Sequence, residues 1–169
     1  MIEGRARLVG DDVNTDYIIS STRKRDSIDE RILARYLFET LDPAFAASVQ
    51  PGDILVAGRN FGCGSAMEVA VTVILAVGIR AVVAESFART FYRNAINNGL
   101  LPVDCATTGI AEGDEIIVRL SDDVADVVHS PSGTVIRARP IPPFMLEILE
   151  RGGLVPYVRG RSRGLDPRD

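Results

Sequence analysis

The chain has 169 residues, 46% of them hydrophobic and 25% charged, a composition typical of a folded domain and unlike that of a disordered protein. Nineteen Lys and Arg against 23 Asp and Glu give a net charge of −4, which disfavours binding to nucleic acid, because that binding neutralises phosphates with cations. The apolar run at 69–79 is too short to cross a membrane, and no signal-peptide core is present. Two cysteines indicate no disulfide framework, so we expect a cytoplasmic protein.

The first hundred residues predict alternating strands and helices. We expect strands at 4–9, 53–57, 80–85 and 100–103. Helices are expected at 30–39, 44–49, 68–77 and 87–96. Residues 13–19 predict a turn with a short β-rich end, and residues 20–27 a polar loop. This alternation is typical of an α/β layer with parallel strands, because parallel neighbours need a crossover connection.

From residue 114 the pattern changes to one that favours antiparallel strands. Strand-like runs at 114–120 and 123–129 are followed by a turn and a third run at 134–139. Pro142 and Pro143 open a last predicted helix, 144–150, which Gly152 and Gly153 end. We expect a single domain over residues 1–158 and a flexible polar tail over residues 159–169.

The turn between the predicted strand 53–57 and the helix that follows is the stretch richest in chemistry. It contains Gly58, Gly62 and Gly64, and glycines allow unusual backbone angles or the close approach of a ligand. Ser65 is expected at the helix N-cap, beside free amides and the positive end of the helix dipole. The turn therefore predicts an anion site, suited to a carboxylate, with a hydroxyl and the thiol of Cys63 nearby.

Two other interpretations of this turn are weaker. A dinucleotide fingerprint would need a third glycine after Gly62 and Gly64, which is absent at the expected spacing. Cys63 could be a nucleophile, since a helix N-terminus lowers a thiol pKa, but the one histidine, His129, lies in a predicted hairpin, where it is expected to be solvated. Cys63 and Cys105 alone cannot hold an iron–sulfur cluster, and Cys105 is expected to be a small buried residue.

Residue types alone leave two roles open. Ser65 fits a plain N-cap, and it also fits an oxygen base or a substrate contact beside an anion site. The cations Arg23, Lys24 and Arg25 fit a solvated face, and they also fit a carboxylate clamp, because Arg presents a planar fork to that group.

Four segments together resemble the small subunit of the isopropylmalate dehydratases, the swivelling domain of the aconitase family. They are Gly-Asp-Asp-Val-Asn-Thr-Asp-Tyr-Ile-Ile at 10–19, Asn-Phe-Gly-Cys-Gly-Ser at 60–65, Glu-Ser-Phe-Ala-Arg at 85–89 and Asn-Ala-Ile-Asn-Asn-Gly-Leu-Leu-Pro at 94–102. The resemblance implies an α/β swivelling domain with β/β/α layers, a mixed sheet and an antiparallel C-terminal section.

The resemblance also implies a reaction and a partner. The family removes water from a 2-hydroxy diacid and adds it back at the neighbouring carbon, as in the isomerisation of 2- and 3-isopropylmalate through isopropylmaleate in leucine biosynthesis. A separate large subunit carries a [4Fe–4S] cluster on its own three cysteines, and the free iron acts as a Lewis acid, so no metal is expected in this chain. A serine of the small subunit takes the proton from the adjacent carbon.

By position, the resemblance assigns roles to residues of this sequence. Ser65 matches the proton-abstracting serine and Asp16 an acidic residue that supports the site. The loop 21–27 falls where the family recognises the variable end of its substrate. The expected substrate-binding set is Ser65, Gly64, Ala66, Thr15, Arg23 and Arg25.

The sequence departs from the family where a substrate carboxylate is held. After Gly64 the family has Ser-Ser-Arg-Glu-His-Ala, whereas this chain has Ser-Ala-Met-Glu-Val-Ala, so Met67 replaces the arginine. A lost charge-assisted hydrogen bond typically costs about 1.5–3 kcal/mol. Either a cation from 23–25 or the partner compensates, or the substrate is another diacid, of methylmalate, dimethylmalate or homoaconitate type. A non-catalytic carboxylate-binding or regulatory module is the remaining alternative.

Overall fold

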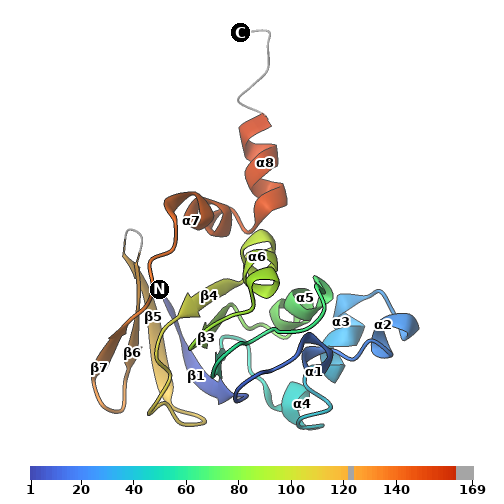
Figure 1. Ribbon diagram of the computed structural model, residues 1–169, viewed down its shortest axis with the longest axis horizontal. Coiled ribbons are helices and arrows are strands. Elements are labelled where there is room, and N and C mark those ends of the chain that lie inside the picture. The colour runs from blue at the N-terminus through green and yellow to red at the C-terminus, as the bar shows by residue number, and fades with distance from the viewer. Residues whose placement is uncertain (122–123, 163–169) are drawn as a thin grey trace, which may run out of the picture.

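In the computed structural model, which describes residues 1–121 and 124–162, one mixed sheet organises the chain (Figure 1). Its strand order is β4-β3-β2-β1-β5-β6-β7. The strands are β1 (Ile2–Leu8), β2 (Ile54–Ala57), β3 (Ala81–Ala84), β4 (Leu101–Asp104), β5 (Glu115–Ser121), β6 (Val124–His129) and β7 (Thr134–Arg137). Strands β1 to β4 pair in parallel, and β5 to β7 pair antiparallel, with β5 joined to β1. The predicted mixed sheet and its antiparallel C-terminal section are therefore confirmed.

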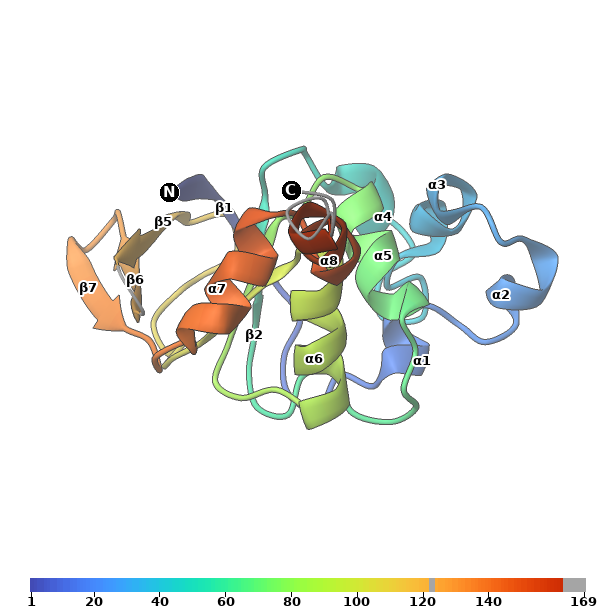
Figure 2. The same ribbon diagram turned by 90° about the horizontal axis from the view of Figure 1, so that it is seen from above.

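The helices are short before β2 and longer after it. They are α1 (Thr15–Ile18), α2 (Arg23–Asp26), α3 (Glu30–Leu33) with a 3₁₀ turn η1 (Ala34–Tyr36), α4 (Phe45–Ser48), α5 (Val69–Ala76), α6 (Arg89–Asn98), α7 (Pro143–Glu150) and α8 (Leu154–Ser162). In Figure 2, α7 lies between α6 and the ribbon formed by β5, β6 and β7. No helix in the described ranges is both long and apolar enough to cross a bilayer.

Two predictions about the N-terminal third are wrong. The helix expected over 30–39 stops early, because Phe38 adopts a left-handed φ of 57° and turns its ring into the core against Phe45, 4.9 Å away. The β-rich end expected within 13–19 is a helical turn, α1. The side chain of Asn14 caps this turn by accepting a hydrogen bond from the Asp16 amide at 2.9 Å.

The parallel strands are buried on both faces, which explains their continuous apolar sequences. In β2, Leu55 and Ala57 join the core under α5 and α6, whereas Ile54 and Val56 join a second core with α7 and β5. The first core includes an aromatic cluster directly beneath the glycine turn. Its rings are Phe61, Phe87 and Phe91, with the Phe61 and Phe91 centroids 4.9 Å apart.

One buried carboxylate fixes the start of β2 against β1. Asp53, 3% exposed, accepts hydrogen bonds from Arg5 at 3.0 and 3.1 Å, from Arg7 at 3.4 Å and from the Gln50 amide at 2.9 Å. Burial acts to raise the pKa of Asp53, but these hydrogen bonds and charges outweigh burial, so its pKa is lowered. The carboxylate is therefore held ionised inside the fold.

Helix α8 continues to Ser162, into the segment expected to be a tail. Residues 163–169 lie outside the described ranges, so the domain limit near residue 158 stays a prediction. Pro156 falls in the first turn of α8, where a missing backbone N–H leaves no helical hydrogen bond unmade.

Candidate functional site

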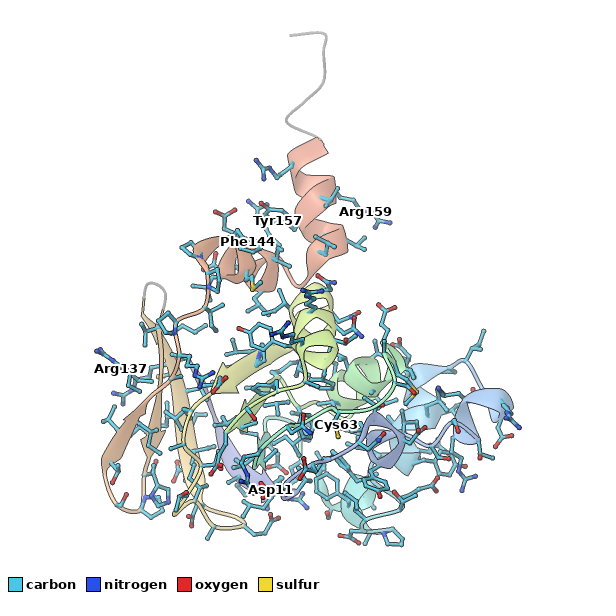
Figure 3. All side chains as sticks on the ribbon, viewed as in Figure 1. Asp11, Cys63, Arg137, Phe144, Tyr157 and Arg159 are labelled. Carbon is cyan, nitrogen blue, oxygen red and sulfur yellow. The ribbon has the colours of Figure 1, made fainter. Side chains whose placement is uncertain are left out.

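Three loops meet at the carboxyl ends of the parallel strands β1, β2 and β3. In sheets of this kind, ligands bind at the carboxyl ends of the strands. The loops are joined by backbone hydrogen bonds, from Gly58 N to Gly10 O (2.9 Å), Gly62 N to Val13 O (2.8 Å), Thr15 N to Cys63 O (2.8 Å) and Phe61 N to Ser86 O (3.0 Å). Asp11 and Cys63, labelled in Figure 3, mark the first two loops.

Charged and polar side chains reinforce this junction. The Asp11 carboxylate accepts hydrogen bonds from the Arg59 amide at 2.7 Å and from the Arg59 guanidinium at 3.1 Å. These contacts hold the pKa of Asp11 below its usual value. The side-chain amide of Asn60 donates a hydrogen bond to the Asp12 carboxylate at 2.9 Å, and its backbone amide donates to the Ser86 hydroxyl at 2.9 Å. These contacts within the chain hold the three loops together.

The structure brings five of the predicted site residues together, since Ala66 directly follows Ser65. Thr15, 2% exposed, donates its hydroxyl to the Ser65 carbonyl at 3.0 Å, and Asp16 follows it in the first turn of α1. Gly64 has a φ of +92°, and a Cβ atom there would lie 2.5 Å from the Asn14 amide oxygen, so only glycine fits. The contacts with Asn14 and Thr15 therefore fix the backbone that carries Ser65.

The groups that face outward from this turn are unpaired. Ser65 is exposed, and its hydroxyl has no hydrogen-bond partner among the described residues. Within the same residues, the backbone amides of Gly64, Ser65 and Ala66 donate no hydrogen bond. The carboxylate of Asp16 is also exposed and unpaired there. Consecutive free amides form a concavity suited to an anion.

Ser65 is not the N-cap that the sequence predicts. Helix α5 begins at Val69, with Glu68 in the cap position and no side-chain cap hydrogen bond. The left-handed Gly64 extends the loop by three residues, so the amides of the first helical turn begin beyond Ser65. The free amides at this turn are therefore loop amides and not those of the first helical turn, and the plain N-cap interpretation of Ser65 is excluded.

The three cations of the loop differ in their surroundings. Arg23 forms a two-pronged ion pair with Glu39, at 2.8 and 2.9 Å, and its guanidinium lies 3.9 Å from the centre of the Tyr36 ring. Arg25 is exposed and has no partner in the described part of the chain. Lys24 extends to the site turn, where its Nζ lies 2.6 Å from Met67 Sδ. The guanidinium of Arg23 is therefore already occupied by contacts with Glu39 and Tyr36.

Lys24 is one of the three cations at 23–25 that the sequence offers as a replacement for the arginine missing at Met67, although the expected substrate-binding set contained only Arg23 and Arg25. Lys24 also lines a hollow of about 280 Å³ beside the turn, together with Ser27, Ile28, Glu30, Leu33, Glu68, Val69 and Thr72.

The two cysteines and Gly62 make contacts that support the fold. The Cys63 thiol donates to the Asp12 carbonyl at 3.5 Å, and the helix N-terminus that could activate it lies six residues further on. Cys105 is buried as expected, and burial raises its pKa to about 12. Gly62 is needed because a side chain there would collide with the Phe91 ring, so this glycine serves packing. Across residues 1–121 and 124–162, no three His, Cys, Asp or Glu side chains converge to hold a metal ion.

The expectation of a solvated His129 is wrong. Its Nε2 lies 2.7 Å from the Asp114 carboxylate and its Nδ1 lies 2.8 Å from the Ser132 hydroxyl, and its side chain is 12% exposed. The hydrogen bond that Asp114 accepts from the Ala111 amide, followed by that from His129, lowers the pKa of Asp114. This group lies at the turn of the β6–β7 hairpin and fixes that turn to the start of β5.

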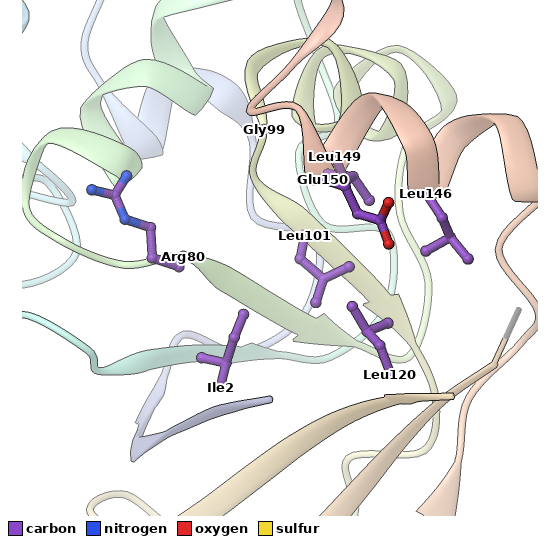
Figure 4. Close-up of a pocket in the computed structure, with 8 residues that line it drawn as sticks. All are labelled: Ile2, Arg80, Gly99, Leu101, Leu120, Leu146, Leu149 and Glu150. Carbon is purple, nitrogen blue, oxygen red and sulfur yellow. The ribbon is translucent and has the colours of Figure 1, made fainter. Parts of the chain in front are cut away.

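A second hollow, of about 430 Å³, lies at the opposite edge of the parallel strands (Figure 4). Ile2 and Leu101 are the first residues of β1 and β4, and Leu146 and Leu149 come from α7. The guanidinium of Arg80 points away from the leucines in Figure 4. This hollow is mostly apolar and is separate from the loops that carry Ser65.

The sheet and its loops define the aconitase type of small domain, and the family of aconitase C-terminal domains matches residues 15–108, more than half of the chain. The chain is 46% identical over 160 residues to the 3-isopropylmalate dehydratase small subunit of Moorella thermoacetica, covering 94% of this chain and 95% of that one. It is 42% identical over 161 residues to the isopropylmalate/citramalate isomerase small subunit of Methanocaldococcus jannaschii, covering 94% of each.

A solved structure gives the same result. The crystal structure of 3-isopropylmalate dehydratase from Methanocaldococcus jannaschii superposes with a TM-score of 0.93 at 41% identity, covering 99% of both chains. The chain therefore belongs to the 3-isopropylmalate dehydratase small-subunit family. This confirms the family resemblance found in the sequence and the fold class that it implied.

Proposed function

We propose that this chain acts as the small subunit of a hydro-lyase that interconverts 2- and 3-isopropylmalate through isopropylmaleate in leucine biosynthesis. The observation that carries the proposal is the turn at 64–66. There a serine hydroxyl and backbone amides, which have no partner within residues 1–121 and 124–162, stand on a backbone fixed by Thr15 and Asn14. Family membership supports the reaction class.

In this proposal each site group has a defined task. The amides of Gly64, Ser65 and Ala66 hold a substrate carboxylate, which keeps the carbon beside it at a constant position relative to Ser65. Ser65 Oγ takes the proton from that carbon, and the neighbouring amides stabilise negative charge as it develops. Asp16, on the first turn of α1, supports the same side of the site.

A second subunit is part of the proposal because the site is open. Gly64, Ser65, Ala66 and Asp16 are all exposed, so water reaches the groups that would perform the chemistry. Proton abstraction beside a carboxylate benefits from exclusion of water. A large subunit that covers this surface would close the site.

The [4Fe–4S] cluster is assigned to that large subunit. In the described residues the two thiols do not fit a cluster. The Cys63 thiol donates a hydrogen bond to the Asp12 carbonyl, and Cys105 is buried just after β4. Both cysteines are free, which supports a reducing compartment, and we propose the cytoplasm. The net charge of −4 gives no support to a nucleic-acid partner.

The test is reconstitution with the large subunit from the same genome under anaerobic conditions. We expect a complex that turns over 2- and 3-isopropylmalate, followed by the ultraviolet absorbance of the unsaturated diacid, whereas either subunit alone does not. Citramalate, dimethylmalate and homoaconitate are assayed in parallel, because Met67 leaves the anion site without its own cation. A complex that assembles with its cluster intact but converts none of these diacids would refute the proposal and favour the non-catalytic module.

A further inference from the structure

The hollow of Figure 4 is a part of the molecule that the proposed reaction does not use. Its volume of about 430 Å³ falls within the range of about 300–1,000 Å³ that is typical of sites for small ligands. Its apolar lining comes from β1, β4, β5 and α7 and consists of Ile2, Leu101, Leu120, Leu146 and Leu149. Leu120 is 42% exposed, so part of this apolar surface is in contact with water. This apolar hollow therefore favours the burial of an aliphatic group.

Two charged side chains, Arg80 and Glu150, give the apolar hollow a polarity. Both are exposed, and neither has an ion pair or a side-chain hydrogen bond within the described residues. Figure 4 shows them on opposite sides of Leu101. A negatively charged group is attracted to Arg80 and repelled by Glu150. An anionic ligand in this hollow is therefore expected to place its charge on the side of Arg80.

Arg80 also lines a second hollow, of about 440 Å³, which is polar. The charges there come from two arginines, Arg31 and Arg80, and one glutamate, Glu30, so the polar hollow carries a net positive charge. The Arg80 guanidinium points away from the leucines of the apolar hollow (Figure 4), and it presents a planar fork that matches a carboxylate. An aliphatic surface on one side of Arg80 and a positive surface on the other are complementary to an aliphatic chain with one anionic end.

We propose that these adjoining hollows bind a small aliphatic monocarboxylate from solution. Its chain lies on Leu101, Leu146 and Leu149, and its carboxylate accepts charge-assisted hydrogen bonds from the Arg80 guanidinium. Glu150 sets the direction of the ligand by repelling a carboxylate from the opposite side of the hollow.

This site is separate from the one that carries Ser65. Helix α6 lies between the two, because Phe91 near its start fills the space beside Gly62 of the site turn, whereas Gly99 directly after its end lines the apolar hollow. The hollow opens at the amino ends of the parallel strands, and the Ser65 loops lie at their carboxyl ends. A bound monocarboxylate therefore leaves the Ser65 loops free and should not compete with a diacid.

The first test is calorimetric titration of the full chain with octanoate, hexanoate and octylamine. We expect octanoate to bind and hexanoate to bind about fifteenfold more weakly, because each buried CH₂ group contributes a factor of about four in affinity. Octylamine has the same chain with a positive end, and it should bind about tenfold more weakly than octanoate. An excess of 3-isopropylmalate should not displace octanoate.

Variants of exposed residues then locate the ligand without disturbing the core. Arg80→Gln should weaken octanoate binding about tenfold, and Glu150→Gln should leave it unchanged or slightly tighter. Arg93→Gln is the matched control, because Arg93 is an exposed cation on α6 that lines neither hollow and has no ion pair in the described residues. Leu120→Gln should weaken binding several-fold by making the lining more polar.

Four results would overturn the inference. They are the absence of octanoate binding at millimolar concentration, equal affinities for octanoate and hexanoate, octylamine binding as tightly as octanoate, and an equal loss of affinity in Arg93→Gln and Arg80→Gln. All of these measurements use this chain without the large subunit, so they do not depend on whether the reconstituted complex converts a diacid.

Discussion

Replacement of Ser65 by alanine should separate catalysis from stability. The Ser65 hydroxyl is exposed, caps no helix and makes no hydrogen bond in the described structure, so Ser65→Ala should change the free energy of unfolding by no more than about 0.5 kcal/mol. If Ser65 Oγ takes the proton, kcat should fall by about 10²–10⁴. That loss corresponds to about 2.7–5.4 kcal/mol in the activation barrier.

Ser86 provides a matched control in the adjacent loop. Its hydroxyl accepts the hydrogen bond of the Asn60 amide at 2.9 Å, so Ser86→Ala leaves that amide without its partner. We expect Ser86→Ala to cost about 1 kcal/mol, a fall of roughly 2–4 °C in Tm, while most of the turnover is retained. The two variants should thus show opposite patterns.

The assay measures kcat of the reconstituted complex, assembly by size-exclusion chromatography and Tm of this chain alone. Near-normal turnover in Ser65→Ala would refute the role of Ser65 as the base. A loss of Tm in Ser65→Ala as large as that in Ser86→Ala would show that the Ser65 hydroxyl supports the fold.

Three further variants test the site and the fold that supports it. Thr15→Val removes the hydrogen bond to the Ser65 carbonyl, and we expect a loss of about 1 kcal/mol in urea unfolding together with a fall in kcat; an unchanged kcat would contradict a positioning role for Thr15. Gly62→Ala should destabilise by more than about 2 kcal/mol, because φ is +77° and the Phe91 ring fills the space, and an unchanged urea midpoint would contradict this. The pKa of Asp53 is lowered, so its carboxylate stabilises the fold above the ordinary carboxyl pKa of about 3.9 and the contribution is lost as pH falls through the lower folded value. Asp53→Asn should therefore be less stable at pH 6, and the difference in urea midpoint should shrink toward pH 3; a constant difference would argue against this linkage.

The sheet was predictable because its strands have unambiguous patterns. The buried strands β2 and β3 are short uninterrupted apolar runs, and the turn at 130–133 indicates the β6–β7 hairpin. Helix α1 was missed because the β-branched residues of 13–19 favour a strand, whereas Asn14 capping and the Thr15 amide bonded to Cys63 O fold them into a turn. The Asn14 cap is a local contact, whereas the hydrogen bond to Cys63 is a tertiary contact, which no local propensity contains.

The sequence predicted which residues form the candidate site better than it predicted how their backbone is arranged. The order of the segments around Thr15, Asp16 and Ser65 carries the family resemblance, and the structure brings these residues together. The start of α5 was predicted to within one residue, but its N-cap was assigned to Ser65 in place of Glu68, because a serine before an apolar run is an ordinary cap signal. Only the backbone shows that Gly64 extends the loop. The separation of Arg23 from Lys24 depends on Glu39, whose contact with the loop no local pattern indicates.

The way helix α2 is attached has a consequence for its tolerance of mutation. None of its residues is buried, and it is held to the rest of the fold through Arg23. Substitutions at residues 24–28 therefore have little effect on folding, so this segment tolerates mutations that the core would reject. Mutations can therefore accumulate in this short helix without compensating changes in the core, and the helix is a segment that can be exchanged with little risk to the stability of the domain.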